Sequence, residues 1–435
     1  MSRTFRTLLL LAAVGVQVGV ATAEDNWPQW RGPLGTGVGA AGDYPVKFSG
    51  EEGLAWKVEL PGPGSSTPAV WGDSIFVTCS IGGEDGLVCY DMQGQEKWRK
   101  TLGAARAGKH KNGSGSNPSP VTDGEHVVVY YKSGRVACLS VKGDEQWQVN
   151  LQEKYAKDTL WWDLGTSPVL AEGKAIIAVM QAGDSYIVAL DLATGEEAWK
   201  TRRQYDRPEE SDQAYTTPTV VQMGGAPILV VWGADHLDGF DARNGRVKWF
   251  SSNYPNFNPE NKAMWRVIAS HAMGGDIAVI PYGRGKFLTA VKIGDAYEDL
   301  EQSSVLWEKQ GVGGDVPTPI IDGDRVYVLN DSGKVTCLAL KTGDEHWSEE
   351  LPKSRNKFYA SPVLGGDKLF CINEAGTVFV GSVGEKFELL SENDMGERVI
   401  ATPVPVRGSL LIRGEQHLFR AGTEAATAAN PAVIK

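Results

Sequence analysis

The sequence predicts an all-β fold, an eight-bladed β-propeller with four-stranded antiparallel blades. A glycine stands four residues before a tryptophan in five places: Gly94/Trp98, Gly143/Trp147, Gly195/Trp199, Gly245/Trp249 and Gly343/Trp347. Two apolar runs precede each pair, and before those comes a proline that usually follows Ser or Thr: Pro68, Pro120, Pro168, Pro218, Pro319, Pro362 and Pro403. A period of about 40–50 residues with four strand-like runs per unit is typical of a propeller.

Each unit divides into an inner strand, two middle strands and an outer strand that carries the tryptophan. In the first unit we expect strands at Thr67–Trp71, Ser74–Ser80, Leu87–Met92 and Glu96–Leu102. A glycine-bearing turn at Gln93-Gly94 joins the last two, which is a hairpin signal between β-rich runs. The units start near Ser66, Asn117, Thr166, Thr216, Ala269, Thr318, Ser361 and Thr402.

Three units depart from this pattern. The fifth, residues 269–310, lacks the Ser/Thr-Pro start. It has an insert at 294–303, so Trp307 comes later in this unit than the tryptophan does in the others. The seventh has Glu388 where the other units have tryptophan, and the eighth ends after three strands near Ala421. Residues 54–60 resemble an isolated outer strand, so we expect them to complete the eighth blade and close the ring without an open edge.

The N-terminus has the features of a secretory signal peptide over residues 1–23. Arg3 and Arg6 precede an apolar run from Leu8 to Val20, and Ala21-Thr22-Ala23 fits a cleavage site before Glu24. An uncleaved anchor is the alternative, although the run is short for spanning a membrane. We further expect an N-terminal extension over 24–53, the propeller over 54–422 and a disordered tail over 423–435.

Charge and cysteine content restrict the classes of function. The formal net charge is −11, and loss of two arginines with the signal peptide makes it −13, so nucleic acid is not an expected partner. The five cysteines leave at least one thiol unpaired in an exported protein. Cys79 and Cys89 lie on successive predicted strands, which leaves open a disulfide between them or two independent buried thiols.

The repeat resembles the PQQ-like, quinoprotein-type propeller family. The copies at 166–199 and 318–347 follow the pattern Ser/Thr-Pro, apolar strand, Gly-x-Val-x-Cys/Ala-Leu-Asp, Thr-Gly and Trp, and Asn26-Trp-Pro-Gln-Trp-Arg-Gly-Pro33 resembles the start of planctomycete-type exported members. The resemblance covers about residues 26–422. The family includes PQQ-dependent alcohol dehydrogenases and noncatalytic scaffolds, among them the lipoprotein propeller subunit of the outer-membrane β-barrel assembly machinery. This chain has no cysteine after the predicted cleavage site to carry such a lipid.

The resemblance implies two roles that can be compared with the residues. Tryptophans of the repeat dock neighbouring blades, here Trp56, Trp98, Trp147, Trp199, Trp249, Trp307 and Trp347. The dehydrogenases need PQQ, Ca²⁺, an Asp base and an adjacent cysteine pair. This chain has no adjacent cysteines and no evident calcium-binding pattern. We therefore expect neither a cofactor nor a metal, with PQQ and Ca²⁺ as the alternative.

The inter-blade loops are the expected binding region, because long loops on a rigid scaffold favour recognition. No nucleophile elbow and no zinc-binding spacing is present. Taken together, the loops at 103–115, 152–165, 201–215, 251–268 and 351–359 bring aromatic and basic residues to one face, which is typical of binding hot spots. The candidate binding residues are Trp161, Trp162, Asp163, Arg202, Tyr215, Trp265, Arg266, His271 and Tyr359.

These observations favour an exported, monomeric, noncatalytic scaffold of the periplasm or cell envelope. It would engage an envelope protein or a small ligand through the loop face and central funnel, with local positive charge suiting an anionic ligand or an acidic segment. Two alternatives remain: a PQQ- and calcium-dependent alcohol dehydrogenase, and a carbohydrate- or polymer-binding protein. The aromatic residues of the loops favour the carbohydrate- or polymer-binding alternative.

Overall fold

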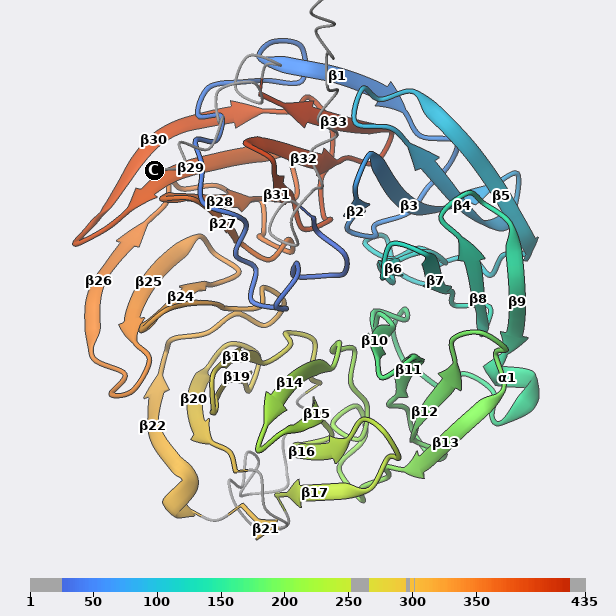
Figure 1. The fold of residues 1–435 in the computed structure, drawn as a ribbon. Helices are drawn as coiled ribbons and strands as arrows, with labels where there is room; N and C mark the ends of the chain where they lie inside the picture. Colours follow the sequence, from blue (N-terminus) through green and yellow to red (C-terminus); the bar gives the residue numbers. More distant parts are fainter. Residues whose placement is uncertain (1–25, 252–265, 295–297, 301, 423–435) are drawn as a thin grey trace, which may run out of the picture.

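The computed structural model describes residues 26–251, 266–294, 298–300 and 302–422, and this part of the chain forms eight sheets arranged around a central axis (Figure 1). Every sheet contains an antiparallel blade of four strands. The predicted signal peptide, the predicted tail and most of the loop at 251–268 lie outside the described residues. No helix in the described part is long and apolar enough to span a membrane.

Blades 1 to 4 follow one another around the ring, each running from its inner strand outward. Blade 1 contains β2 (Ala69–Trp71), β3 (Ser74–Ile81), β4 (Glu84–Tyr90) and β5 (Glu96–Ala104). Blade 2 contains β6 (Val121–Thr122), β7 (His126–Tyr130), β8 (Arg135–Ser140) and β9 (Glu145–Asn150), followed by α1 (Leu151–Lys154). Blade 3 contains β10 (Val169–Ala171), β11 (Lys174–Val179), β12 (Tyr186–Asp191) and β13 (Glu197–Arg202). Blade 4 contains β14 (Thr219–Met223), β15 (Ala226–Gly233), β16 (His236–Asp241) and β17 (Val247–Phe250).

Blades 5 to 8 complete the ring. Blade 5 contains β18 (Ala272–Gly274), β19 (Ile277–Tyr282), β20 (Phe287–Lys292) and β22 (Val305–Gln310), with β21 (Glu298–Asp299) and the 3-10 helix η2 (Gln302–Ser304) in its insert. Blade 6 contains β23 (Ile320–Asp322), β24 (Arg325–Leu329), β25 (Lys334–Ala339) and β26 (Glu345–Glu350). Blade 7 contains β27 (Val363–Gly365), β28 (Lys368–Ile372), β29 (Thr377–Val383) and β30 (Phe387–Asp394). Blade 8 contains β31 (Val404–Val406), β32 (Ser409–Arg413), β33 (His417–Ala421) and β1 (Leu54–Glu59).

The irregular units confirm the predicted architecture and add one detail. β1 pairs antiparallel with β33, so both ends of the propeller meet in blade 8 (Figure 1). Blade 5 is complete despite its insert, and Trp307 faces Ala290 across β20 and β22 as expected for an outer-strand tryptophan. β21 in the insert adds to the free edge of β17 as a parallel strand, which gives blade 4 a fifth strand.

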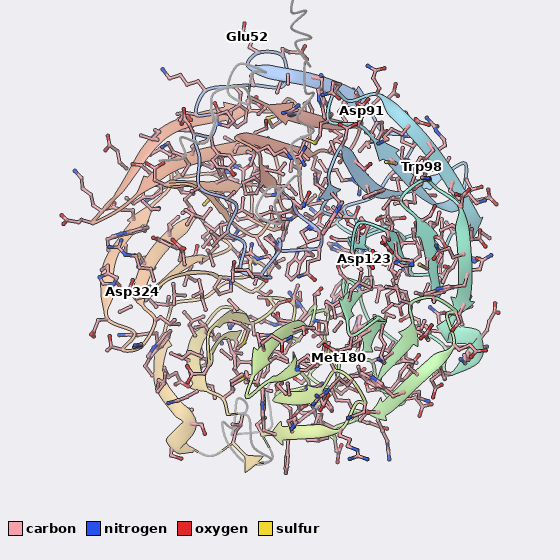
Figure 2. The ribbon with its side chains drawn as sticks, viewed as in Figure 1. Glu52, Asp91, Trp98, Asp123, Met180 and Asp324 are labelled. Atoms are coloured by element: carbon pink, nitrogen blue, oxygen red, sulfur yellow. The ribbon has the colours of Figure 1, made fainter. Side chains whose placement is uncertain are left out.

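Five of the seven repeat tryptophans meet the glycine of the next motif rather than the glycine of their own. The ring of Trp98 lies over Gly143 of blade 2, and its indole N–H donates to the Val141 carbonyl at 3.1 Å. Trp98 stands in the outer part of the disc (Figure 2). The same pair of contacts joins Trp56 to blade 1, Trp147 to blade 3, Trp199 to blade 4 and Trp307 to blade 6. The motif glycine has no Cβ, and this leaves room for the neighbouring ring.

Two tryptophans pack differently because their neighbours are irregular. Trp347 donates its N–H to the Gly384 carbonyl of blade 7 at 3.3 Å and packs against Phe387, with ring centroids 5.7 Å apart. Trp249 precedes the irregular blade 5, is fully buried, and covers Gly239 in its own blade. Its indole N–H has no partner among the described residues. All five cysteines are buried free thiols, so Cys79 and Cys89 are independent.

Candidate functional site

A ring of hydroxyl groups surrounds the central axis where the inner strands begin. The residue before each repeat proline, or its equivalent in blade 5, donates its backbone N–H to the side-chain oxygen of the same residue in the next blade. Seven such bonds of 2.9–3.3 Å run through blades 1 to 8. We call this set the hydroxyl ring: Thr67, Ser119, Ser167, Thr217, Ser270, Thr318, Ser361 and Thr402.

Above the hydroxyl ring, the inter-blade loops enclose a central funnel of about 440 Å³. All eight ring residues line it, and so do five of the predicted binding residues. They come from four inter-blade loops and meet only in the folded chain: Trp162 and Asp163 from one loop, and Tyr215, Arg266 and Tyr359 from three others.

Trp162 is held at the funnel wall from several sides. Its indole N–H donates to Glu210 at 2.7 Å, and its backbone N–H donates to the Tyr215 hydroxyl at 3.0 Å. The Arg266 guanidinium lies 5.9 Å from the Trp162 ring and pairs with Asp315 at 2.8 Å. A ring fixed in this way offers a preorganised aromatic surface, and the paired arginine beside it adds little net charge.

Asp163 is a structural carboxylate rather than a free ligand. It accepts hydrogen bonds from the backbone N–H groups of Lys109 and His110 at 2.8–2.9 Å and forms a buried ion pair with Lys132. Burial alone would raise the pKa of Asp163, but the Lys132 ammonium and the two N–H groups outweigh it and hold the pKa below its usual range. Asp163 therefore ties the loop after blade 2 to the loop after blade 1 through the two N–H groups, and to the β7–β8 turn through Lys132.

The remaining predicted residues lie elsewhere. Arg202 is on β13 beside a shallow depression formed with Tyr205 and Arg207, outside the funnel. Trp161 is 45% exposed, with its backbone N–H bound to Gln213. His271 is 2% exposed, and neither ring nitrogen has a partner among the described residues; burial lowers its pKa to about 3. Trp265 lies outside the described residues.

The funnel floor comes from the N-terminal extension, to which the sequence analysis assigned no binding role. Residues from 26 onward cross the axis and bridge β2 through Trp27 and Val70, and β27 through Val38 and Leu364 (Figure 1). Trp30 lines the funnel from below, and the buried Arg31 side chain donates to the carbonyls of Pro319 and Pro362. The Asn26–Pro33 motif was visible in the sequence, but its position at the axis was not.

Some of the charges expected to make the loop face positive are paired. Arg106 binds Asp158 at 3.1 Å, and Arg207 lies 3.8 Å from Asp235. The buried Arg203 pairs with Asp238 at 2.8 Å. These pairs fix the loops to the blades, whereas the exposed Lys111, Lys353 and Arg355 form no ion pair among the described residues and leave positive charge on the loops.

The described residues do not suit a PQQ and calcium site. Calcium requires six to eight oxygen ligands, usually with several carboxylates. Asp163 is the one carboxylate among the described lining residues, and Lys132 and two backbone N–H groups already occupy it. Within the described ranges, no cluster of three or more His, Cys, Asp and Glu side chains forms a metal site.

Fold and funnel together define the class of protein: a closed eight-bladed propeller of PQQ-like repeats with a loop-lined central funnel. A family model described as outer membrane protein assembly factor BamB matches residues 132–382 and 260–416, and the chain belongs to this family. The BamB of Moranella endobia (strain PCIT) is 24% identical over 288 residues, which are 66% of this chain and 64% of that protein. The match thus covers less than two thirds of that relative's length.

Solved structures show the same fold at low sequence identity. BamB from Moraxella catarrhalis is 12% identical with a TM-score of 0.59, covering 85% of this chain and 99% of that structure. Quinohemoprotein alcohol dehydrogenase from Comamonas testosteroni is 14% identical with a TM-score of 0.63, covering 95% and 83%. The likeness to both BamB and an alcohol dehydrogenase establishes the architecture, and the function has to be argued from the residues of the site.

Proposed function

We propose that the chain is an exported, noncatalytic scaffold of the cell envelope that binds a protein partner through its loop face and funnel. Family membership supports this proposal, since the matching family model is described as an assembly factor of the outer membrane. The observation that carries it is the funnel lining, which combines fixed aromatic rings with hydroxyl groups. Its carboxylate among the described residues, Asp163, is already paired with Lys132. Such a lining can recognise a ligand, and Asp163 is not free to act as a general base.

The exposed side chain of Trp161 supports a protein partner at the same face. It is 45% exposed on a loop next to Trp162, which lines the funnel. Aromatic residues at the centre of an interface commonly carry much of the binding energy. An interface centred on the funnel would bury Trp161, whereas the opposite side of the channel is covered by the N-terminal extension.

Site-specific photocrosslinking in the producing cells tests this function. A photoreactive phenylalanine derivative replaces Trp161 in one variant and Leu34 in a control variant, which is 76% exposed in the N-terminal extension. We expect crosslinks to an envelope protein from position 161 and none to that protein from position 34. Equal crosslinking from both positions, or none from position 161, would contradict a loop-face interface.

A cofactor titration separates the scaffold from the dehydrogenase. We expect the purified protein, titrated with PQQ and Ca²⁺, to show neither saturable quenching of tryptophan fluorescence nor alcohol-dependent dye reduction. The reason is that the described lining lacks free carboxylates to hold the cation. Turnover with both additions would establish the dehydrogenase instead.

A further inference from the structure

The hydroxyl ring presents unused hydrogen-bond donors to the funnel. Seven of its oxygens accept a backbone N–H from the preceding blade, and the eighth, Thr67 Oγ1, makes no hydrogen bond in the described structure. None of the eight hydroxyls donates to an acceptor among the described residues. Because a hydroxyl that accepts a hydrogen bond becomes a better donor, the ring directs polarised O–H groups into the cavity.

A buried guanidinium lies just below these donors. Arg31 is 1% exposed and donates to the carbonyls of Pro319, Pro362 and Thr36 at 2.5–3.2 Å. Pro319 and Pro362 directly follow ring residues, so the cation sits one residue beneath the ring. Within the described residues no carboxylate pairs with it. Burial lowers its pKa to about 9, which still leaves it charged at neutral pH.

A second buried arginine stands at the wall, where blades 8 and 1 meet. Arg413 is 1% exposed and donates through Nη1 to the backbone and side-chain oxygens of Ser66. Its Nε and Nη2 have no partner among the described residues. It borders a small cavity of about 60 Å³ whose lining includes Ser65, and Ser65 also lines the central funnel.

Two other charged groups near the funnel are paired. Lys132 is matched by Asp163, and Arg266 is matched by Asp315. Arg31 and Arg413 are therefore two positive charges without a carboxylate in the described part, within a chain of net charge −11. An uncompensated buried charge is costly, and an oxyanion that also accepts O–H bonds would remove much of that cost.

We propose that the funnel throat, at the hydroxyl ring, binds a carboxylate group carried by an acidic or C-terminal segment of the partner. This inference rests on the proposed function, because it takes the funnel as the recognition site of a protein. A carboxylate fits the donor set, since its two oxygens can accept several O–H bonds from the ring. The buried Arg31 guanidinium does not line the funnel, but its charge beneath the ring favours an anion there. The volume of about 440 Å³ is in the range of small-molecule sites, which suits a chain end rather than a folded domain.

The test uses the full mature protein and a matched peptide pair. An N-acetylated alanine pentapeptide with a free C-terminal carboxylate is titrated beside the same peptide as its C-terminal amide, with tryptophan fluorescence and calorimetry as readouts. We expect the carboxylate peptide to bind about tenfold more tightly, as one charge-assisted hydrogen bond predicts, and to weaken with added salt. Equal binding of both peptides, no binding, or tighter binding of inorganic phosphate would overturn the proposal.

Three variants locate the site. Thr67→Val keeps the side-chain shape and removes a hydroxyl that makes no hydrogen bond in the described structure, so the fold is retained while carboxylate binding weakens severalfold. Arg31→Gln removes the positive charge beneath the ring and weakens binding by about tenfold through the lost electrostatic attraction. Lys341→Gln removes an exposed charge from the β25–β26 turn and leaves binding unchanged.

Each result then has a definite meaning. Wild-type affinity in folded Thr67→Val and Arg31→Gln proteins would refute a throat site. If Arg31→Gln does not fold, two results still test the throat site: the affinity of Thr67→Val and the difference in affinity between the acid and amide peptides. Partner crosslinking from position 161 without any discrimination between the two peptides would leave the scaffold function standing and remove only this inference.

Discussion

The pKa of a buried group in this propeller depends both on its burial and on the hydrogen-bond donors that face it. Asp163 and Asp85 are both buried, but Asp163 receives a lysine and two backbone N–H groups, and its pKa is lowered. Asp85 receives the Ser133 hydroxyl at 2.5 Å with Arg135 at 3.8 Å, and burial raises its pKa to about 6. A buried aspartate can therefore stabilise or destabilise the fold at neutral pH, depending on the hydrogen-bond donors and cations around its carboxylate.

The Asp163–Lys132 pair gives a first prediction at this scale. Asp163→Asn leaves the Lys132 ammonium buried without a counter-charge, so we expect a loss of about 3–5 kcal/mol in the free energy of unfolding at pH 7. Urea denaturation measures it. Adding Lys132→Met in the same chain removes the orphaned charge and should restore part of the loss. A loss below about 1 kcal/mol in Asp163→Asn would show that the pair is not structural.

His271 gives a second prediction, through pH. Burial lowers its pKa from 6.5 to about 3, so between these values the unfolded chain binds the extra proton. The free energy of unfolding therefore falls as pH falls below 6.5, by about 1.4 kcal/mol per pH unit from this group. His271→Phe should remove that slope, measured as the difference from wild type between pH 6.5 and 5. The exposed His346→Gln serves as control, and parallel curves for His271→Phe and wild type would contradict the expectation.

At the scale of elements, the repeat motif works between blades. A glycine in one β-turn leaves space for the indole ring of the preceding blade, and the ring donates to a carbonyl beside that turn. Each blade therefore needs its own glycine to receive a neighbour and its own tryptophan to dock on the next. Blade 7 has no such tryptophan, and its Phe387 instead packs against Trp347.

Two glycines of blade 3 test this contact at matched backbone strain. Gly173 and Gly195 have φ of +68° and +72°, but a Cβ on Gly173 meets nothing within 4 Å, while one on Gly195 lies 2.6 Å from the Trp147 ring. Gly173→Ala should cost about 1 kcal/mol from positive φ alone. Gly195→Ala should cost about 1–3 kcal/mol more, because the ring must move. Thermal unfolding measures both, and equal losses would mean that the ring adapts freely.

The whole molecule was easier to predict than its funnel. Eight units and the completing role of residues 54–60 follow from periodicity, because each blade must pair its strands locally and the last lacked one. Trp162, Tyr215 and Arg266 were found because they lie on inter-blade loops, which all approach the axis. Arg202 fits the same pattern but lies at the end of an outer strand, away from the axis.

The residues that the sequence analysis missed depend on long-range placement. The Ser or Thr before each proline was visible as a repeat start, but its hydrogen bond to the next blade exists only once the ring closes. Arg31 is separated by 288 residues from its partner Pro319, and no local signal relates the two. A recurring hydroxyl at a strand start that faces a common axis is the signal that would have predicted the hydroxyl ring.

Closure of the whole ring gives the last prediction. Trp56 and Trp98 are a matched pair, each half-buried, each packed on a motif glycine, with indole N–H bonds of 2.9 and 3.1 Å. Trp98 joins blades that are adjacent in sequence, whereas Trp56 lies on β1 and holds the seam between blades 8 and 1. Substitution of either tryptophan by Ala should lower the free energy of unfolding by about 3 kcal/mol. Only Trp56→Ala should also free β1 from β33, exposing a strand edge that promotes oligomers. Light scattering and limited proteolysis near residue 54 measure this, and identical behaviour of the two variants would mean that the seam is held by β1 pairing alone.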